Sequence, residues 1–224
     1  LVLFTGFRWV NYIVNLGTWI TTFTGSGMAS TLAIGNALHH MVNHGLTTQR
    51  FTLRPFQRAD LEAFTAYRAN PKIAKYQSWT DYSYSDAVSL FENMDYAQFG
   101  AADTWFQLAI VSEASLATPA TLVGDLALHF IDEQQMEIGF TIAPEYQGQQ
   151  VAFEAVSALL GYLFVELNKH RVIAITDVDN LACCRLLEKL GFRREAHYVK
   201  NIFFKGAWGD EYLYAMLRED YIAR

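Results

Sequence analysis

The spacing of hydrophobic residues predicts alternating strands and helices from residue 50 onwards. Residues 50–56 alternate apolar and polar side chains with the period of two that is typical of a strand. Residues 60–70 have the pattern of a capped helix that ends before Pro71. An aromatic-rich region then surrounds a helix predicted to start near Ser85, and its aromatic side chains either fill the core or line a pocket.

Three strand-like segments follow, at residues 104–111, 121–131 and 135–142. The last two form a predicted hairpin whose turn is residues 132–134. In that register His129 lies directly across from Glu137. A slip of one residue would move every side chain of a strand to the other face and would separate the pair.

After Pro144 the apolar positions take the period of a helix. We predict a long amphipathic helix over residues 153–167, a strand over 171–176 and a second helix over 180–190, which Gly191 ends. Two further strands, over 192–200 and 211–217, follow it.

Residues 1–46 differ in composition from the rest of the chain. Residues 9–38 contain no Asp, Glu, Lys or Arg, but asparagines and glycines interrupt them, which makes a poor membrane span. The chain starts at Leu1, and Met28 and Met41 both precede the first clear strand. We expect residues 1–46 to be a hydrophobic extension that is disordered or not native, and residues 47–224 to be one domain.

Charge and cysteine content exclude some partners and settings. The formal net charge of -6, without a run of Lys or Arg, argues against nucleic acid as a partner. The two cysteines, Cys183 and Cys184, are adjacent and cannot link distant segments, which indicates a reducing, cytoplasmic location.

The segment at residues 137–155 is the candidate for chemistry. A strand that passes through a glycine turn into a helix directs unpaired backbone N–H groups, and the positive end of the helix dipole, at one point. Such a point suits a pyrophosphate, although one glycine before a helix is also a common turn device. The spacing is neither that of a P-loop nor that of a dinucleotide fingerprint.

Two motifs carry a family resemblance: residues 138–155, which include Pro-Glu-Tyr-Gln-Gly-Gln-Gln, and residues 180–192, which begin Asn-Leu-Ala-Cys-Cys. Together they resemble the GNAT superfamily of N-acetyltransferases, and with residues 50–56 they resemble most the branch of the ribosomal-protein N-terminal acetyltransferases (RimJ/RimL-like). The resemblance implies an α/β fold of the α+β type. Its sheet is mixed, mostly antiparallel, of six or seven strands with helices on both faces, and is split between residues 135–142 and 171–176.

The resemblance also implies acetyl-CoA as co-substrate, direct transfer of the acetyl group to a primary amine, and no metal. The pyrophosphate would lie on backbone amides around Gly148, and the pantetheine arm would lie in the split beside Asn180. A bulge in the third strand would leave an N–H free for the thioester carbonyl near residues 140–142. The expected cofactor-binding residues are Phe140, Thr141, Ile142, Gln147, Gly148, Gln149, Gln150, Val151, Ala152, Asn180 and Cys183.

Three residues are candidates for catalysis. Glu137 is the candidate base for the incoming ammonium, or else a solvent-facing strand residue. His129 joins it if the predicted register holds, and otherwise packs in the sheet. Cys183 stands where relatives have a serine that protonates the leaving thiolate, or else is a buried apolar residue, with Tyr198 as a remote alternative.

One position departs from the family pattern. Gln150 stands where glycine or alanine is usual, and its side chain either crowds the phosphate or points away along the helix. If it crowds the site, the chain is a catalytically silent CoA-binding domain.

The acceptor and the assembly stay open at this point. The branch implies a protein N-terminus, while aminoglycosides and polyamines are served by near relatives. We expect a monomer or homodimer without a membrane anchor, although a tether through residues 9–38 is the alternative. His39, His40 and His44 have no carboxylate or cysteine near them in the sequence to complete a zinc site.

Overall fold

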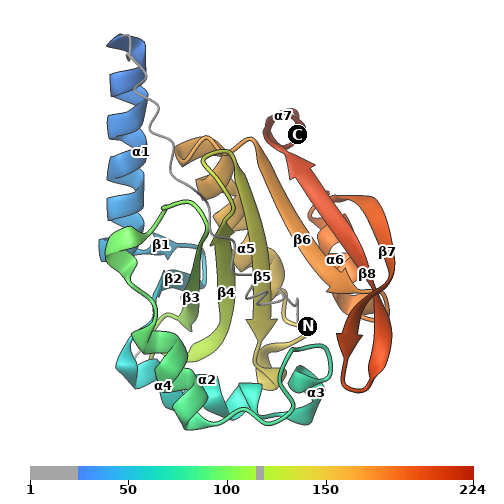
Figure 1. Ribbon diagram of the computed structural model, residues 1–224. Coiled ribbons are helices and arrows are strands. Elements are labelled where there is room, and N and C mark those ends of the chain that lie inside the picture. Colours follow the sequence, from blue (N-terminus) through green and yellow to red (C-terminus); the bar gives the residue numbers. More distant parts are fainter. Residues whose placement is uncertain (1–24, 115–118) are drawn as a thin grey trace, which may run out of the picture.

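The computed structural model describes residues 25–114 and 119–224, and its centre is an eight-stranded sheet (Figure 1). The strand order is β1-β2-β3-β4-β5-β6-β8-β7, and the neighbouring strands pair antiparallel except for β5 and β6. The bounds are β1 Leu46–Thr47, β2 Phe51–Pro55, β3 Thr104–Ser112, β4 Leu122–Phe130, β5 Gln135–Ile142, β6 Arg171–Asp177, β7 Arg193–Phe204 and β8 Ala207–Leu217. The sequence predicts all of these except β1, whose two residues are too few for a periodic signal.

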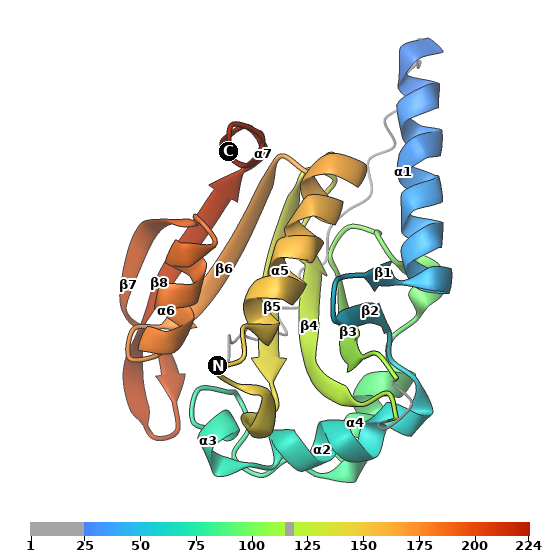
Figure 2. The ribbon, with the colours of Figure 1, turned by 180° about the vertical axis from the view of Figure 1, so that it is seen from behind.

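Helices cover both faces of the sheet, as predicted. The helices α5 (Val151–Gly161) and α6 (Leu181–Lys189) lie in front of the sheet in Figure 2. On the other face, α2 (Leu61–Arg68) and α4 (Tyr84–Glu92) form a separate apolar cluster with Ala109 and Val111 of β3, which alternate with core residues Leu108 and Ile110. The remaining described helices are α1 (Gly25–His44), α3 (Pro71–Ala74) and α7 (Arg218–Ile222).

Capping interactions set the starts of the helices on the second face. Ser83 Oγ accepts from the Asp86 amide at 3.3 Å while the Asp86 carboxylate accepts from the Ser83 amide at 2.8 Å, and α4 begins after this capping box. The capped helix predicted over residues 60–70 is observed as α2, but the Asp60 side chain makes no capping hydrogen bond to it. A 3-10 turn, Arg58–Asp60, already gives Asp60 a helical backbone, and its carboxylate pairs with Arg54 at 2.7 Å.

The long helix predicted over residues 153–167 consists of two segments. Its α-helical part, α5, ends at Gly161, and the chain continues as a π-helical turn, Tyr162–Glu166. The Leu167 amide donates to the Tyr162 carbonyl at 3.0 Å, which is the wider spacing of that helix type.

The register predicted for the β4–β5 hairpin is confirmed. The Ile131 amide donates to the Gln135 carbonyl at 3.1 Å and closes the predicted turn. His129 therefore lies across from Glu137.

Helix α1 falls within the 1–46 extension predicted from the sequence. Its C-terminal part packs on the core through Met41, which is 1% exposed, and the Tyr162 hydroxyl donates to the Ala37 carbonyl at 3.2 Å. The N-terminal part of α1 projects away from the sheet (Figures 1 and 2). Residues 1–24 lie outside the described residues, and the boundary at residue 47 stays a prediction.

Candidate active site

The β5–α5 turn, residues 143–150, joins the end of β5 to the first residue of α5. Its backbone is left-handed at Gly148 (φ 76°) and at Gln150 (φ 63°). Gln147 Nε2 donates to the Ile142 carbonyl at 2.9 Å, and Gln149 Nε2 donates to the Glu145 carbonyl at 2.8 Å. The turn is thus held in place, and it ends where the first amides of α5 have no acceptor within the helix.

The space beside Gly148 is open. A Cβ at this position would meet no heavy atom within 4 Å. A cavity of about 230 Å³ opens between the turn and α6, and its lining includes Gly148, Val151, Ala152 and Lys189. Helix-end amides and an ammonium group are what a phosphate anion requires, so these residues fit the pyrophosphate of a CoA thioester.

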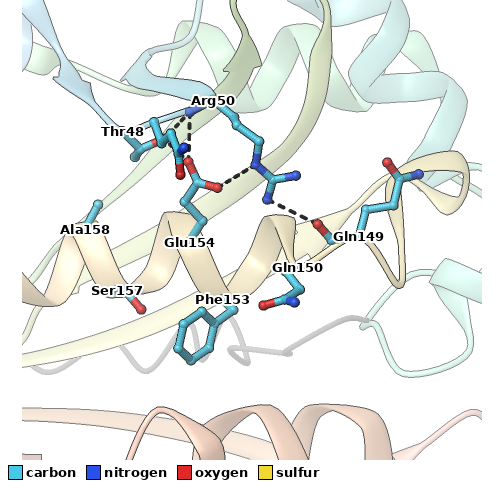
Figure 3. A pocket seen from close by; sticks show the side chains of 9 residues that line it. Thr48, Arg50, Gln149, Gln150, Phe153, Glu154, Ser157 and Ala158 are labelled. Carbon is cyan, nitrogen blue, oxygen red and sulfur yellow. Dashed lines mark hydrogen bonds and ion pairs between the residues drawn. The ribbon is translucent and has the colours of Figure 1, made fainter.

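Gln150 is exposed, and its side chain does not cap α5. In Figure 3 this side chain extends on the Phe153 side of α5, away from Arg50. It lines the cavity beside Gly148 as well as a second one on the other side of α5. Gln150 therefore borders the candidate phosphate site, and the αL backbone that glycine usually supplies is adopted here by a glutamine.

An ion pair on the opposite side of α5 connects the β5–α5 turn to the N-terminal strands (Figure 3). Arg50 Nε lies 2.7 Å from Glu154 Oε2, and Arg50 Nη2 donates to the Gln149 carbonyl at 3.1 Å. The Glu154 carboxylate also accepts from the Thr48 hydroxyl at 2.7 Å. These residues line the second cavity, of about 540 Å³. Arg50 fixes the β5–α5 turn on this side through its hydrogen bond to Gln149.

The strands β5 and β6 are neighbours along only three residues each. Gln135–Glu137 pair with Arg171–Ile173. From residue 138 onwards β5 has no strand partner on that side among the described residues, while β6 continues beside β8 (Figure 1). The predicted split between these strands is confirmed, and Glu137 lies at its closed end, which we call the apex.

The prediction of a bulge near residues 140–142 is wrong. The register of β5 with β4 is continuous from Met136 to Ile142. Phe140, Thr141 and Ile142 nevertheless have a free strand edge, because β6 diverges from them. An extended group could therefore bind along this edge of β5 because β6 diverges from it, and not because β5 contains a bulge.

The confirmed hairpin register brings two predicted catalytic residues together at the apex. His129 Nδ1 is 3.6 Å from Glu137 Oε2. The two side chains are 16% and 12% exposed, so the pair is mostly buried but reachable.

The other predicted site residues lie at the start of α6. Asn180 is buried, and its Oδ1 accepts from the Cys183 amide at 3.3 Å, which caps the helix. The Cys183 thiol is fully buried in the main core, and this burial raises its pKa well above the ordinary value, so the thiol stays protonated. A role for Cys183 in protonating a thiolate stays a prediction. Tyr198 lies on β7, at the edge of the sheet.

Sequence reasoning missed a buried charged cluster that adjoins the free half of β5. Asp125 pairs with Thr141 across the β4–β5 ladder. Its carboxylate accepts from the Tyr67 hydroxyl at 2.5 Å, from Arg68 Nη2 at 3.1 Å and from Gln107 Nε2 at 2.9 Å. Burial raises the pKa of Asp125. The sequence signal is one acidic residue, Asp125, in a strand that is apolar apart from His129.

No group of three or more His, Cys, Asp or Glu side chains in residues 25–114 and 119–224 could hold a metal ion. In the same residues, none of the helices has both the length and the apolar character needed to cross a membrane.

Comparison with known proteins gives concordant likenesses. A family model described as "Acetyltransferase (GNAT) domain" matches residues 50–193. The chain is 31% identical to the uncharacterized N-acetyltransferase YnaD of Bacillus subtilis, over 79% of this chain and 98% of the relative.

Two solved structures are similar to this one. An acetyltransferase (GNAT family) from Bacillus anthracis matches with a TM-score of 0.68 at 30% identity, over 78% of this chain and 98% of that one. A spermidine N-acetyltransferase from Vibrio cholerae, in complex with CoA and spermine, matches with a TM-score of 0.64 at 25% identity, over 77% of this chain and 98% of that one.

Proposed function

The chain belongs to the GNAT family of acetyltransferases, and on that basis we propose that it transfers an acetyl group from acetyl-CoA to a primary amine of a small polycation. The observation that carries the proposal is the arrangement around β5. At one end is a glycine turn that leads into the first amides of α5, and along its side is an edge that β6 leaves after Glu137.

Donor binding uses the backbone more than the side chains. The amides of residues 148–152 and the Lys189 ammonium would bind the pyrophosphate of acetyl-CoA. The free edge of β5 at residues 140–142 would hydrogen-bond the pantetheine arm in the way an added strand is bound. When bound, acetyl-CoA supplies an activated acetyl group with a thiolate as the leaving group.

Proton removal is assigned to Glu137. An amine attacks only as the neutral base, and at neutral pH most primary amines are ammonium ions. Glu137 is a carboxylate at the apex, where the split closes and where it would face an acceptor entering from its side of the sheet. Positioning the two reactants in one split supplies much of the remaining rate enhancement.

The acceptor is proposed from charge. The pairing of β5, β6 and β8 places Glu137, Asp177 and Glu211 on one face of the sheet. Burial raises the pKa of Asp177, and its negative charge is therefore best stabilised by a cation. The net charge of -6 also attracts a polycation. The similar Vibrio cholerae structure is that of a spermidine N-acetyltransferase, which supports a polyamine as the acceptor.

A protein N-terminus is the second candidate acceptor. It is favoured by the resemblance of residues 50–56 and 180–192 to the ribosomal-protein N-terminal acetyltransferases. We also propose a cytoplasmic location, because both cysteines are free thiols. The proposed assembly is a monomer or homodimer.

The test is to incubate the full chain with acetyl-CoA and either spermidine or short peptides with free N-termini, and to measure thiol release and acetylated product by mass spectrometry. We expect turnover with spermidine. Turnover with the peptides alone would favour the second candidate. Binding of acetyl-CoA without turnover on any amine would overturn the enzyme proposal in favour of a silent domain, and recovery of turnover in Gln150→Gly would show that the glutamine crowds the site.

A further inference from the structure

His129 lies between two carboxylates, one at the apex and one at the surface. Its Nδ1 is 3.6 Å from Glu137 Oε2, and its Nε2 is 3.4 Å from Asp103 Oδ1. Glu137 belongs to β5, His129 to β4, and Asp103 directly precedes β3. Asp103 is 95% exposed, so the row runs from the mostly buried apex to solvent.

The orientation of the His129 ring is set by two neighbours. Trp105, its partner across the β3–β4 ladder, stacks on it with ring centroids 4.3 Å apart and planes inclined by 8°. Asp103 is anchored by its own backbone, because its amide donates to the Phe130 carbonyl at 2.6 Å. Its left-handed conformation (φ 56°) is one that aspartate adopts more readily than most residues.

The hydrogen bond to Asp103 favours one of the two positions of the ring proton. A neutral imidazole has one N–H and one acceptor nitrogen, and an ionised carboxylate only accepts. Asp103 therefore favours the tautomer with the proton on Nε2. Nδ1 is then an acceptor that faces the Glu137 carboxylate, and among the described residues this buried atom has no hydrogen-bond partner. A proton placed between Nδ1 and Glu137 Oε2 would give both atoms a hydrogen-bond partner.

We propose that Glu137 and His129 jointly hold the proton that the acceptor ammonium loses, with Asp103 and Trp105 as positioning residues. This inference rests on the proposed function. Glu137 takes a proton from R–NH3+, and His129 Nδ1 shares it while its Nε2–H donates to Asp103. The resulting imidazolium would have one N–H facing each of the two carboxylates.

With this assignment, every proton in the acetyl transfer is accounted for. The neutral amine forms a C–N bond to the acetyl carbon as the C–S bond breaks. The shared proton returns through Glu137 to the thiolate, giving CoA–SH, and the second proton on nitrogen leaves to solvent. The net reaction converts R–NH3+ and the thioester into the acetamide, the thiol and one released proton, with no other co-reactant.

The first experiment measures steady-state kinetics of His129→Ala with and without added imidazole. We expect kcat to fall roughly a hundredfold, which is within the range for loss of acid–base assistance, while KM for acetyl-CoA stays within about twofold. Added imidazole should restore a large part of kcat, because the substitution leaves a space beside Trp105 that the free base can enter. A purely structural role would not respond to imidazole.

The matched control is His197→Ala. His197 also pairs with an aspartate, Asp210 at 2.7 Å, and also contacts an aromatic ring, that of Tyr212. It lies across from Tyr212, on the other face of the sheet from Glu137. Its kcat should stay near wild type and should not respond to imidazole.

The positioning role is tested with Asp103→Asn, which keeps a residue that tolerates the left-handed backbone. We expect kcat to fall severalfold, because a neutral amide stabilises the imidazolium less than a carboxylate, while Glu62→Gln, an exposed carboxylate on α2, changes nothing. Unchanged kcat in His129→Ala, or a loss that imidazole does not restore, would overturn this inference alone. A wild-type chain that acetylates no amine would overturn the proposed function and this inference with it.

Discussion

Gly148 and Gln150 share a left-handed backbone, but the conformation costs them different amounts. Glycine has no Cβ and adopts it freely, whereas for other L-residues it costs roughly 1–2 kcal/mol. The chain retains this strained backbone at Gln150, directly before the first amides of α5. If the proposed phosphate site uses those amides, the backbone of Gln150 contributes more to it than the glutamine side chain does.

A charge placed at Gly148 tests the phosphate site at the scale of one residue. Gly148→Asp should keep the fold, because a Cβ there meets no heavy atom within 4 Å, but the left-handed backbone should lower the free energy of unfolding by about 1 kcal/mol. It should weaken acetyl-CoA binding roughly tenfold, because the carboxylate competes for the helix-end amides and repels the phosphates. Isothermal titration calorimetry measures this change.

Gly206→Asp is the control for that substitution. Gly206 also has a positive φ (85°) and open space around a Cβ, but it lies in the β7–β8 hairpin. Equal weakening of acetyl-CoA binding in both variants would show that the effect comes from net charge and not from the β5–α5 turn.

At the scale of elements, α5 is connected to the N-terminal strands by the Arg50–Glu154 pair. Burial alone would raise the pKa of Glu154, but hydrogen bonds from Thr48 and Arg50 outweigh it and lower the pKa below its ordinary value of 4.5. The ionised carboxylate therefore stabilises the fold above about pH 4.5, and this contribution is lost as the pH falls through the lowered pKa.

Arg50→Ala should weaken acetyl-CoA binding severalfold, because the Gln149 carbonyl loses the donor that holds the β5–α5 turn. The free energy of unfolding should fall by no more than about 1 kcal/mol at neutral pH, because the Arg50 side chain is half-exposed and solvent screens the pair. Calorimetric titration and urea denaturation measure the two effects separately.

The control for Arg50 is Arg58→Ala, which removes an exposed ion pair with Glu92. It should change neither quantity. If Arg50→Ala also leaves acetyl-CoA binding unchanged, the turn holds its shape without the ion pair, and the coupling between α5 and the N-terminal strands is unimportant for binding.

At the scale of the whole molecule, the main core extends beyond the predicted domain into α1. Met41 is buried among core residues, while Leu32, nine residues earlier on the same helix, is 69% exposed. Met41→Ala should lower the free energy of unfolding by about 2–4 kcal/mol, because it leaves a cavity in the core. Leu32→Ala should change it by less than about 0.5 kcal/mol.

Urea denaturation of the two variants checks this prediction. Equal, small effects would mean that α1 is not part of the cooperative unit, in agreement with the domain boundary predicted at residue 47. A large effect of Met41→Ala alone would move the start of the folding unit to the last turns of α1.

The sequence by itself determined the features that depend on local periodicity and turn length. The strand predicted over residues 135–142 has the observed bounds, and the three-residue turn before it places His129 across from Glu137. The helices that begin at Tyr84 and Leu181 follow from nearby capping residues, Ser83 and Asn180. These features could be predicted because each depends on residues only a few positions apart.

Only the tertiary structure decided the contacts between distant segments. Arg50 meets Glu154 across 104 positions, Arg68 meets Asp125 across 57, and Asp103 meets His129 across 26. The free edge of β5 results from the direction that β6 takes. The family resemblance implied this split, but no property of β5 itself indicates it. The physical reason is that hydrophobic period specifies which face of an element is buried, whereas strand order and divergence depend on how all the elements pack together.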